Sequence, residues 1–347
     1  MLPDIKDFSF KELEAAMAEL GEPGFRAGQI FAWIYQWGVR SFEACTDLSK
    51  TLRMKLKERY ALGFPELIRR LQSSDLTEKF LLKLADGHSI ECVLIPSGAR
   101  KTLCLSTQVG CKFGCVFCAS GRGGFKRNLK ASEILGQVLF LRDRLNMSLT
   151  NFVFMGMGEP LDNFENTARA ILIMNSPEGL GIAARRMTVS TAGVVPGIEW
   201  LRDLGLQVNL SFSLHAVRDG LRSKLVPLNR KYPLERVIKA CQDYGRTSGR
   251  RLTLEYVLIQ NVNDGPADAD GLARIAARLK AKINLIPYSP VCGLDFEPPS
   301  KSRVDRFLKL LDERGARVTL RQSKGLDIQA ACGQLAGSRG AGAAESK

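Results

Sequence analysis

The sequence predicts an α/β fold in which six parallel strands form an incomplete barrel. From residue 103 onward, short apolar segments alternate with longer amphipathic segments, which is typical of βαβ units and a parallel sheet. Six strands are fewer than the eight of a closed (β/α)8 barrel, although a doubly wound sheet shows the same alternation. The expected strands are residues 103–107, 151–157, 186–191, 207–214, 251–259 and 282–287, and residues 318–321 would add one more.

The segments between these strands are predicted to be helices that cover the barrel. Their apolar residues recur at the three- and four-residue spacing of one helix face. The expected helices are residues 131–144, 167–174, 234–244, 267–279 and 301–314.

The chain before the barrel divides into two smaller regions. Residues 10–20, 29–37 and 48–60 are predicted helices, and Ser9 followed by Glu12 is a capping box at the start of the first. Residues 79–84 and 89–95 are predicted strands, joined through the turn pair Asp86-Gly87. We therefore expect a helical accessory domain at 1–65, a β extension at 66–101, a barrel with a C-terminal loop at 102–335, and a disordered tail at 336–347.

Composition narrows the classes of function. The 347 residues carry 50 Lys and Arg against 36 Asp and Glu, a net charge of +14. Such an excess suits a partner rich in phosphate, although a basic soluble protein would also show it. Only two histidines are present, which excludes a His-rich metal site. We find no signal peptide and no apolar stretch of membrane-spanning length, and the nine cysteines cannot all pair, so a reducing cytoplasm is expected.

Three cysteines form the strongest motif of the sequence. Cys111, Cys115 and Cys118 have the spacing C-x3-C-x2-C in a glycine-containing loop directly after the first barrel strand. Three thiolates at this spacing can hold three irons of a [4Fe–4S] cluster and leave the fourth iron open. The alternative is structural zinc, with a fourth ligand such as Cys104.

This motif, with the aromatic Phe117 before its last cysteine, resembles that of the radical S-adenosylmethionine (SAM) superfamily. The resemblance implies a partial radical SAM barrel in which the open iron binds SAM and the cluster supplies the electron that yields a 5′-deoxyadenosyl radical. It also implies a set of residues that contact SAM at the carboxyl ends of the strands, where barrel sites are built. These residues are Gly158, Glu159, Ser190, Ser213, Leu214, His215 and Ser289.

Four further segments resemble one branch of that superfamily, the RNA adenine methyltransferases of the RlmN and Cfr type. They are ECVLIP at 91–96, TLCLSTQVGC at 102–111, FMGMGEP at 154–160 and DIQAACGQL at 327–335. Within the branch, the long N-terminal module and the Glu91 segment favour the C2-methylating RlmN type. One departure is Ser289, where the family pattern has Asn.

The resemblance assigns roles to three residues outside the cluster motif. Cys332 would receive a methyl group from SAM and become an S-methylcysteine intermediate. A radical on that methyl carbon would add to adenine, and Glu91 would then accept the ring proton. Cys104 would attack the Cys332 sulfur and release the RNA, leaving a transient disulfide. Pattern alone favours a solvated strand residue for Glu91, and it allows Cys104 to be a core residue or a fourth metal ligand.

The implied reaction is methylation of C2 of adenine in 23S rRNA, near the peptidyl transferase centre, and in tRNA beside the anticodon. The target base would have to leave its stack to reach a buried site. Cations such as Arg122, Lys126, Arg127, Lys130 and Arg185 are candidates for phosphate contacts. The expected partners are these RNAs and an electron donor such as flavodoxin, with a monomeric chain and no membrane. The alternatives are C8 methylation of the Cfr type and a zinc-stabilised RNA-binding protein without catalysis.

Overall fold

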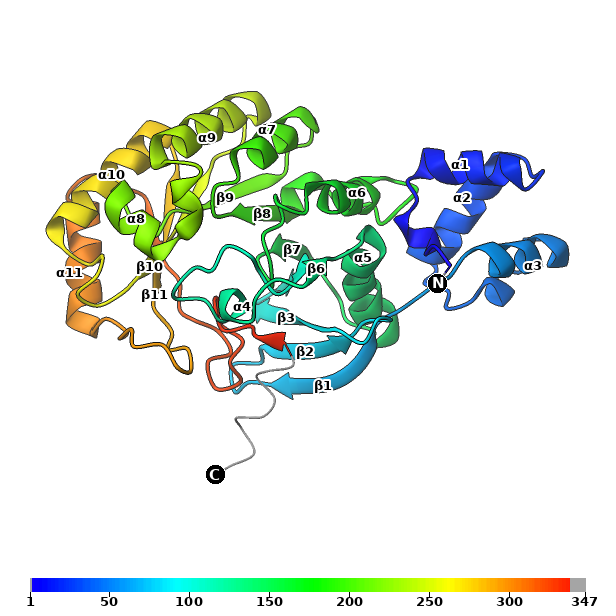
Figure 1. The fold of residues 1–347 in the computed structure, drawn as a ribbon, viewed down its shortest axis with the longest axis horizontal. Helices are drawn as coiled ribbons and strands as arrows, with labels where there is room; N and C mark the ends of the chain where they lie inside the picture. Colours follow the sequence, from blue (N-terminus) through cyan, green and yellow to red (C-terminus); the bar gives the residue numbers. More distant parts are fainter. Residues whose placement is uncertain (1, 338–347) are drawn as a thin grey trace.

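The computed structural model describes residues 2–337, and its centre is one ten-stranded sheet (Figure 1). The strand order is β1-β2-β3-β4-β7-β8-β9-β10-β11-β12, antiparallel from β1 to β4 and parallel from β4 to β12. The six predicted parallel strands are present, and β12 is a seventh. The strands are β1 (Glu66–Gln72), β2 (Glu78–Lys83), β3 (Ser89–Ser97), β4 (Arg100–Cys104), β7 (Asn151–Phe154), β8 (Met187–Thr191), β9 (Asn209–Ser213), β10 (Thr253–Leu258), β11 (Lys282–Pro287) and β12 (Val318–Leu320).

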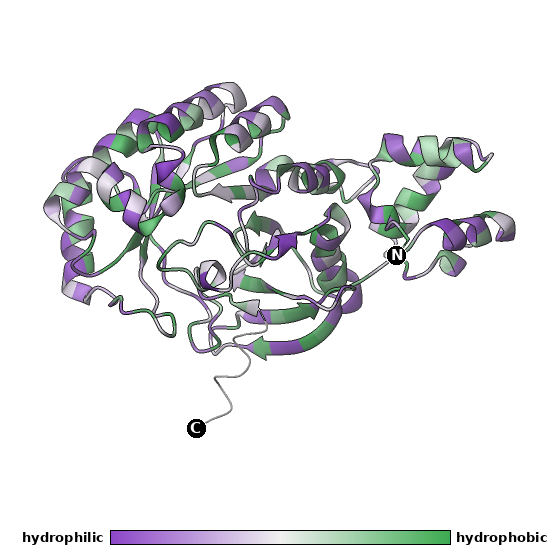
Figure 2. Ribbon diagram, in the orientation of Figure 1, coloured by the Kyte–Doolittle hydropathy of each residue, from purple (hydrophilic) through white to green (hydrophobic). Residues whose placement is uncertain are grey.

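Helices connect the parallel strands and cover the outside of the curved sheet (Figure 1). They carry bands of both hydropathy colours in Figure 2, as expected for helices with one face on a sheet and one in water. They are α5 (Ala131–Leu139), extended by the π-helical η4 (Phe140–Arg144), α6 (Phe164–Asn175), α7 (Val195–Asp203), α8 (Asp219–Leu225), α9 (Leu234–Ser248), α10 (Pro266–Leu279) and α11 (Lys301–Asp312). Shorter elements are η5 (Ala184–Arg186), η6 (Pro227–Arg230), α4 (Ala119–Arg122) and the strand pair β5 (Gln108–Val109) and β6 (Arg127–Asn128).

The N-terminal helices form a separate group at one side of the barrel (Figure 1). The predicted capping box is present, because the Ser9 and Glu12 side chains each accept the other residue's backbone N–H. Asp7 joins the group to the barrel by accepting the backbone N–H of Ser132, at 2.7 Å. The elements are η1 (Ile5–Asp7), α1 (Phe10–Glu19), α2 (Phe25–Phe31), the π-helical η2 (Ala32–Gln36), η3 (Phe42–Ala44) and α3 (Lys50–Arg59).

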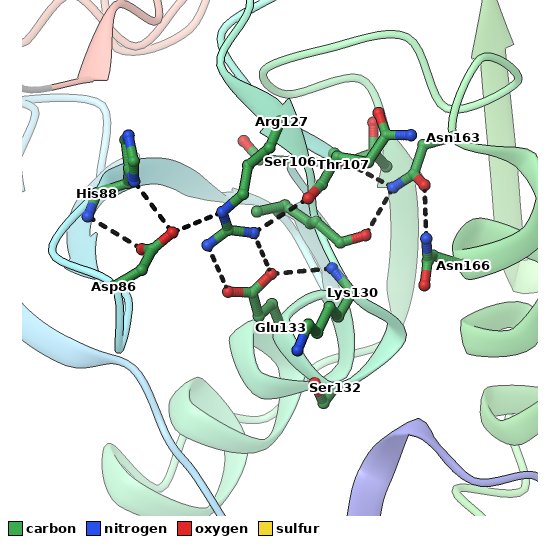
Figure 3. Close-up of polar contacts among 12 residues, drawn as sticks. Asp86, His88, Ser106, Thr107, Arg127, Lys130, Ser132, Glu133, Asn163 and Asn166 are labelled. Atoms are coloured by element: carbon green, nitrogen blue, oxygen red, sulfur yellow. Dashed lines mark hydrogen bonds and ion pairs between the residues drawn. The ribbon is translucent and has the colours of Figure 1, made fainter. Parts of the chain in front are cut away.

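A polar network ties the predicted hairpin turn to the barrel (Figure 3). Arg127 on β6 pairs with Asp86 in the β2–β3 turn at 2.6 Å and with Glu133 on α5 at 2.7 Å. His88 also bonds to Asp86, at 3.0 Å. Arg127 is therefore paired with two carboxylates inside the protein, and its role as a phosphate contact stays a prediction.

Three elements of seven or more residues were not predicted, β1, α7 and α8. The edge strand β1 contains the charged residues Glu66, Arg69 and Arg70. Its residues alternate between exposed and half-buried, so the sequence lacks the regular apolar positions that predict a strand. The helix α7 contains Pro196 near its start, and α8 is only 7 residues long. The second predicted helix also begins earlier than expected, at Phe25, because Gly24 and Pro23 precede a well-formed first turn.

The predicted tail lies outside the described residues from 338 onward. Its first two residues, Ala336 and Gly337, are described, and both donate a backbone N–H to Glu91.

Candidate active site

One cavity lies at the carboxyl ends of the parallel strands, as parallel-strand geometry requires. Ten of the thirteen predicted site residues line it, and three do not: Glu91, Cys104 and Leu214. The ten are Cys111, Cys115, Cys118, Gly158, Glu159, Ser190, Ser213, His215, Ser289 and Cys332.

The loop after β4 presents the three motif cysteines to this cavity. Gly114 adopts a φ of +58°, which lets the loop turn between the first two cysteines. Burial raises the pKa of Cys111 to about 12, and the nearby Cys118 sulfur adds to the effect. Burial raises the pKa of Cys115 further, again with contributions from the other two thiols. The three thiols line one cavity and interact electrostatically, and a bound metal cluster would hold them there as thiolates.

No three His, Cys, Asp or Glu side chains within residues 2–337 are grouped as a binding site for a metal ion. Whether the cavity suits a cofactor is therefore judged from the chemical groups that line it. The three motif thiols, the Ser190 and Ser213 hydroxyls and the Glu159 carboxylate face one space, which suits a thiolate-bound cluster beside an amino-acid-like ligand.

The segment after β7 holds the buried carboxylate. A Cβ at Gly158 would lie 2.5 Å from the Gln108 side chain, so the backbone can pass here only as glycine. Glu159 accepts the backbone N–H groups of Ala192 (2.8 Å) and Leu161 (3.2 Å). Burial nevertheless raises the pKa of Glu159 to about 7. A cationic amine placed beside it would favour the ionised form.

The ends of β8 and β9 supply hydroxyl and imidazole groups. The Ser190 and Ser213 hydroxyls lie 3.2 Å apart. His215 has a φ of +57°, an uncommon conformation outside glycine, and its Nδ1 accepts the backbone N–H of Val257 at 3.1 Å. Burial, with a smaller contribution from the charge of Arg222, lowers the pKa of His215 to about 3. His215 is therefore neutral and has Nε2–H as its remaining donor.

Two further predicted residues, Leu214 directly after β9 and Ser289 after β11, make different contacts from each other. Leu214 is fully buried, and its backbone N–H bonds to the Glu255 carbonyl, so its side chain belongs to the core. The Ser289 hydroxyl bonds to the Ser323 hydroxyl at 2.7 Å, which orients it at the cavity wall.

The C-terminal segment returns to the cluster loop and brings Cys332 into the cavity. Gly333 accepts the backbone N–H of Ala119 at 2.7 Å, and Leu335 accepts the Ser120 hydroxyl at 2.6 Å. Gln334 donates to the Pro290 carbonyl at 2.8 Å. In Figure 1 this segment lies beside α4, directly after the cluster motif. Segments more than two hundred residues apart therefore share one site.

Cys104, at the end of β4, lies close to Cys332. It is 8% exposed, and burial raises its pKa to about 12, with the Cys332 sulfur as the next largest contribution. Burial also raises the pKa of Cys332, which keeps some exposure to solvent. Both thiols are therefore protonated at rest. Of the remaining cysteines, Cys45, Cys92 and Cys241 are buried, and Cys292 is exposed.

Glu91 lies beneath the C-terminal segment, outside the cavity lining. It shares a sheet face with Cys104, because Val93, two residues along β3, pairs directly with Cys104. Its carboxylate forms an ion pair with Lys79 at 3.0 Å and accepts the backbone N–H groups of Ala336 (2.7 Å) and Gly337 (3.0 Å). Lys79 also donates to the Gln329 carbonyl at 3.1 Å. The buried Lys79–Glu91 pair therefore holds the C-terminal segment in place on both sides of Cys332.

Several site residues were not predicted. Lys79 was assigned only to a strand, and its role depends on a tertiary contact. Met155, Glu255, Val257 and Ile286 also line the cavity. Glu255 had a usable signal, since it is the one charged residue within the apolar run of β10, TLEYVL.

Comparison with known proteins agrees with this geometry. Residues 105–270 match the model of the radical SAM superfamily. A crystal structure of a radical SAM methyltransferase from Sphaerobacter thermophilus superposes with a TM-score of 0.91, at 46% identity over 96% of this chain and 99% of that one. The chain is thus a radical SAM enzyme, whose cofactors are a [4Fe–4S] cluster and SAM, and the zinc alternative is excluded.

The N-terminal helices specify the family. Residues 3–62 match the ribosomal RNA large subunit methyltransferase N-terminal domain, RlmN_N. The dual-specificity RNA methyltransferase RlmN of Syntrophus aciditrophicus is 45% identical over 96% of both chains. The protein of that name from Syntrophobacter fumaroxidans is 45% identical over 95% of this chain and 97% of its own. This chain belongs to the RlmN family of radical SAM RNA methyltransferases. None of its described helices is long and apolar enough to cross a membrane.

Proposed function

We propose that the chain methylates C2 of adenine in two RNAs, 23S rRNA near the peptidyl transferase centre and tRNA beside the anticodon. The observation that supports this proposal is that Cys332 lines the same cavity as the cluster cysteines and that the Cys104 thiol is near enough to interact with it electrostatically. Adenine C2 is electron-poor, so a methyl group cannot be delivered there by simple displacement on SAM. Two protein thiols solve this problem: the first carries the methyl group, and the second releases the methylated product.

The bound cluster and SAM would supply both the methyl group and the 5′-deoxyadenosyl radical. Cys332 accepts the methyl group, which requires loss of its thiol proton. Its exposure to the cavity gives a ligand access to the sulfur, while Arg321 favours the thiolate. The hydrogen bonds of Gly333 and Gln334 hold the Cys332 backbone in place.

Cys104 then attacks the Cys332 sulfur, so that a disulfide forms and the bond from that sulfur to the methylene carbon breaks. The released carbon takes up a proton and becomes the methyl group of the RNA, and the unpaired electron of the adduct would pass to the bound cluster. The buried position of Cys104 keeps its thiol protonated and unreactive until the substrate is joined to Cys332. Glu91 accepts the proton that the adenine ring loses. Because Lys79, Ala336 and Gly337 occupy its carboxylate, this step requires the C-terminal segment to loosen.

The remaining parts of the proposal concern RNA, compartment and partners. The N-terminal helices, which pack beside the barrel, are proposed as an RNA-binding domain, supported by the match of residues 3–62. The name of the relatives, dual-specificity RNA methyltransferase, supports two RNA classes. We expect a cytoplasmic monomer that takes electrons from a donor such as flavodoxin. C2 is preferred to C8 because the N-terminal domain and the relatives are of the RlmN type.

Nucleoside analysis tests the reaction. The reconstituted enzyme is incubated without oxygen with SAM, a reductant and unmodified 23S rRNA or tRNA, and the digested RNA is compared with 2- and 8-methyladenosine standards. The proposal expects 2-methyladenosine from both RNAs. A product with the methyl group on C8, or modification of one RNA alone, would contradict the corresponding part. The variant Cys292→Ala, which changes an exposed cysteine outside the cavity, is the matched control and should react normally.

A further inference from the structure

A second, larger cavity lies at the opposite end of the barrel interior. Its volume is about 750 Å³, against about 170 Å³ for the cofactor cavity. Barrels of this kind are normally filled by branched apolar side chains. Here the inward-facing positions near the amino ends of the strands are polar instead. They include Thr188, Asn209, Ser211, Thr253 and Asn284.

The two cavities meet inside the barrel. Met155 and Glu255 line both of them, so the polar cavity adjoins the space that contains Cys332. The other end of the barrel is spanned by the C-terminal segment and the cluster loop, which Gly333 and Leu335 join by hydrogen bonds. The amino-terminal end therefore offers a polar approach to the side of the barrel interior that holds Cys332.

The outer part of this second cavity is strongly basic. Five cations stand at or near the amino ends of the strands, and a sixth, Arg321, follows β12 (Val318–Leu320). Glu255 is the only carboxylate among the lining residues. None of the six cations forms an ion pair within residues 2–337. The five outer cations are Arg100, Arg185, Arg250, Arg251 and Lys282.

Glu255 is an unusual residue for such a position. It is 5% exposed, and its Oε1 accepts the Asn284 side-chain N–H at 3.0 Å. Its Oε2 is buried and has no hydrogen-bond partner among the described residues, although the Ser211 hydroxyl lies near. A buried acceptor without a donor is costly, which indicates that a ligand supplies the donor. Since Glu255 and Cys332 line the same cavity, that ligand would reach the space that Cys332 also faces.

We propose that the polar cavity admits the target nucleotide, that Glu255 accepts a hydrogen bond from the 6-amino group of adenine, and that the outer cations bind the flanking phosphates. This inference rests on the proposed function and adds to it the route of the RNA and a specificity-determining residue. The amino group and C2 lie on either side of ring nitrogen N1, so one base can reach Glu255 and Cys332 together. A purine with a carbonyl at position 6 would place an acceptor against an acceptor, and would be rejected.

The variant Glu255→Gln tests the base contact. Asn284 donates to Oε1, so the glutamine amide nitrogen would replace Oε2 and present a donor to the cavity. The assay measures methylation of stem-loop RNAs that carry adenosine or inosine at the target position, both of which have a free C2. The parent enzyme should prefer adenosine by about tenfold or more. The variant should lose this preference or reverse it, a ratio that partial unfolding would not change.

An unchanged ratio in Glu255→Gln would overturn the assignment of Glu255. Failure of the parent enzyme to methylate either RNA would instead contradict the proposed function, so the two failures are distinct. The route is tested with Arg250→Ala/Arg251→Ala, by titrating the adenosine stem-loop at several salt concentrations. Binding should weaken, and the salt dependence should fall by about one phosphate contact for each cation removed. Arg306→Ala, on the exposed side of α11, is the control, and an equal effect there would refute the route.

Discussion

Replacing Lys79 with methionine should release the C-terminal segment that carries Cys332. Lys79 and Glu91 form a buried ion pair, with side-chain exposures of 10% and 6%. Lys79→Met keeps the length of the side chain but removes its bonds to Glu91 and to the Gln329 carbonyl. Glu91 then keeps only its two backbone donors. Breaking a buried pair from one side costs about 3–5 kcal/mol, because the remaining charge has lost its partner.

Urea denaturation and amide hydrogen exchange measure this effect. The free energy of unfolding should fall by about 3 kcal/mol, and exchange should accelerate at Ala336 and Gly337, whose N–H groups bond to Glu91. The double variant Lys79→Met/Glu91→Gln should lose less than the sum of the two single variants, since the two groups interact directly.

The surface pair Lys57–Glu43 supplies the control. Its side chains are 70% and 56% exposed, so Lys57→Ala should leave the stability of the protein unchanged. If Lys79→Met left the free energy of unfolding unchanged, as Lys57→Ala should, the buried pair would not hold the C-terminal segment in place. Additive effects of the two substitutions in the double variant would refute the reasoning in the same way.

Two further predictions concern the cofactor cavity. Substitution of any one motif cysteine by alanine should abolish 5′-deoxyadenosine formation after anaerobic reconstitution, because two thiolates cannot hold the cluster with one open iron; undiminished product would refute the ligand set. His215 has a lowered pKa, so its stabilising effect is present above pH 6.5 and is lost as the pH falls toward about 3. Below pH 6.5, the parent protein should therefore lose about 1.4 kcal/mol per pH unit more than His215→Asn, which tolerates the same backbone conformation; parallel stability curves would contradict a neutral, buried His215.

The sequence predicted the parallel strands and the end of the barrel at which the cofactor site lies. Both follow from local pattern, because strand ends in a parallel barrel share one face. Gly158, Glu159, Ser190 and Ser213 could therefore be placed in one cavity before any distance was known.

The local sequence pattern could not predict contacts between segments that are far apart in the chain. Nothing near Lys79 indicates that it bonds to Glu91 and Gln329, and nothing near Arg127 indicates its two ion pairs. The juxtaposition of Cys104 and Cys332 was implied only by family resemblance. Glu255 was detectable in principle as a charge within an apolar strand, but its unpartnered oxygen is a property of the folded barrel.

The most direct test of the central claim is mass spectrometry of the Cys104→Ala enzyme after reaction with SAM and RNA. The two thiols have opposite roles, so their loss should have opposite results. Cys104→Ala should accumulate a covalent adduct that survives denaturation, with the Cys332 peptide joined through one methylene carbon to adenine C2. Cys332→Ala should form none. Normal turnover of Cys104→Ala without an adduct, or an adduct on a different cysteine such as Cys292, would contradict the account.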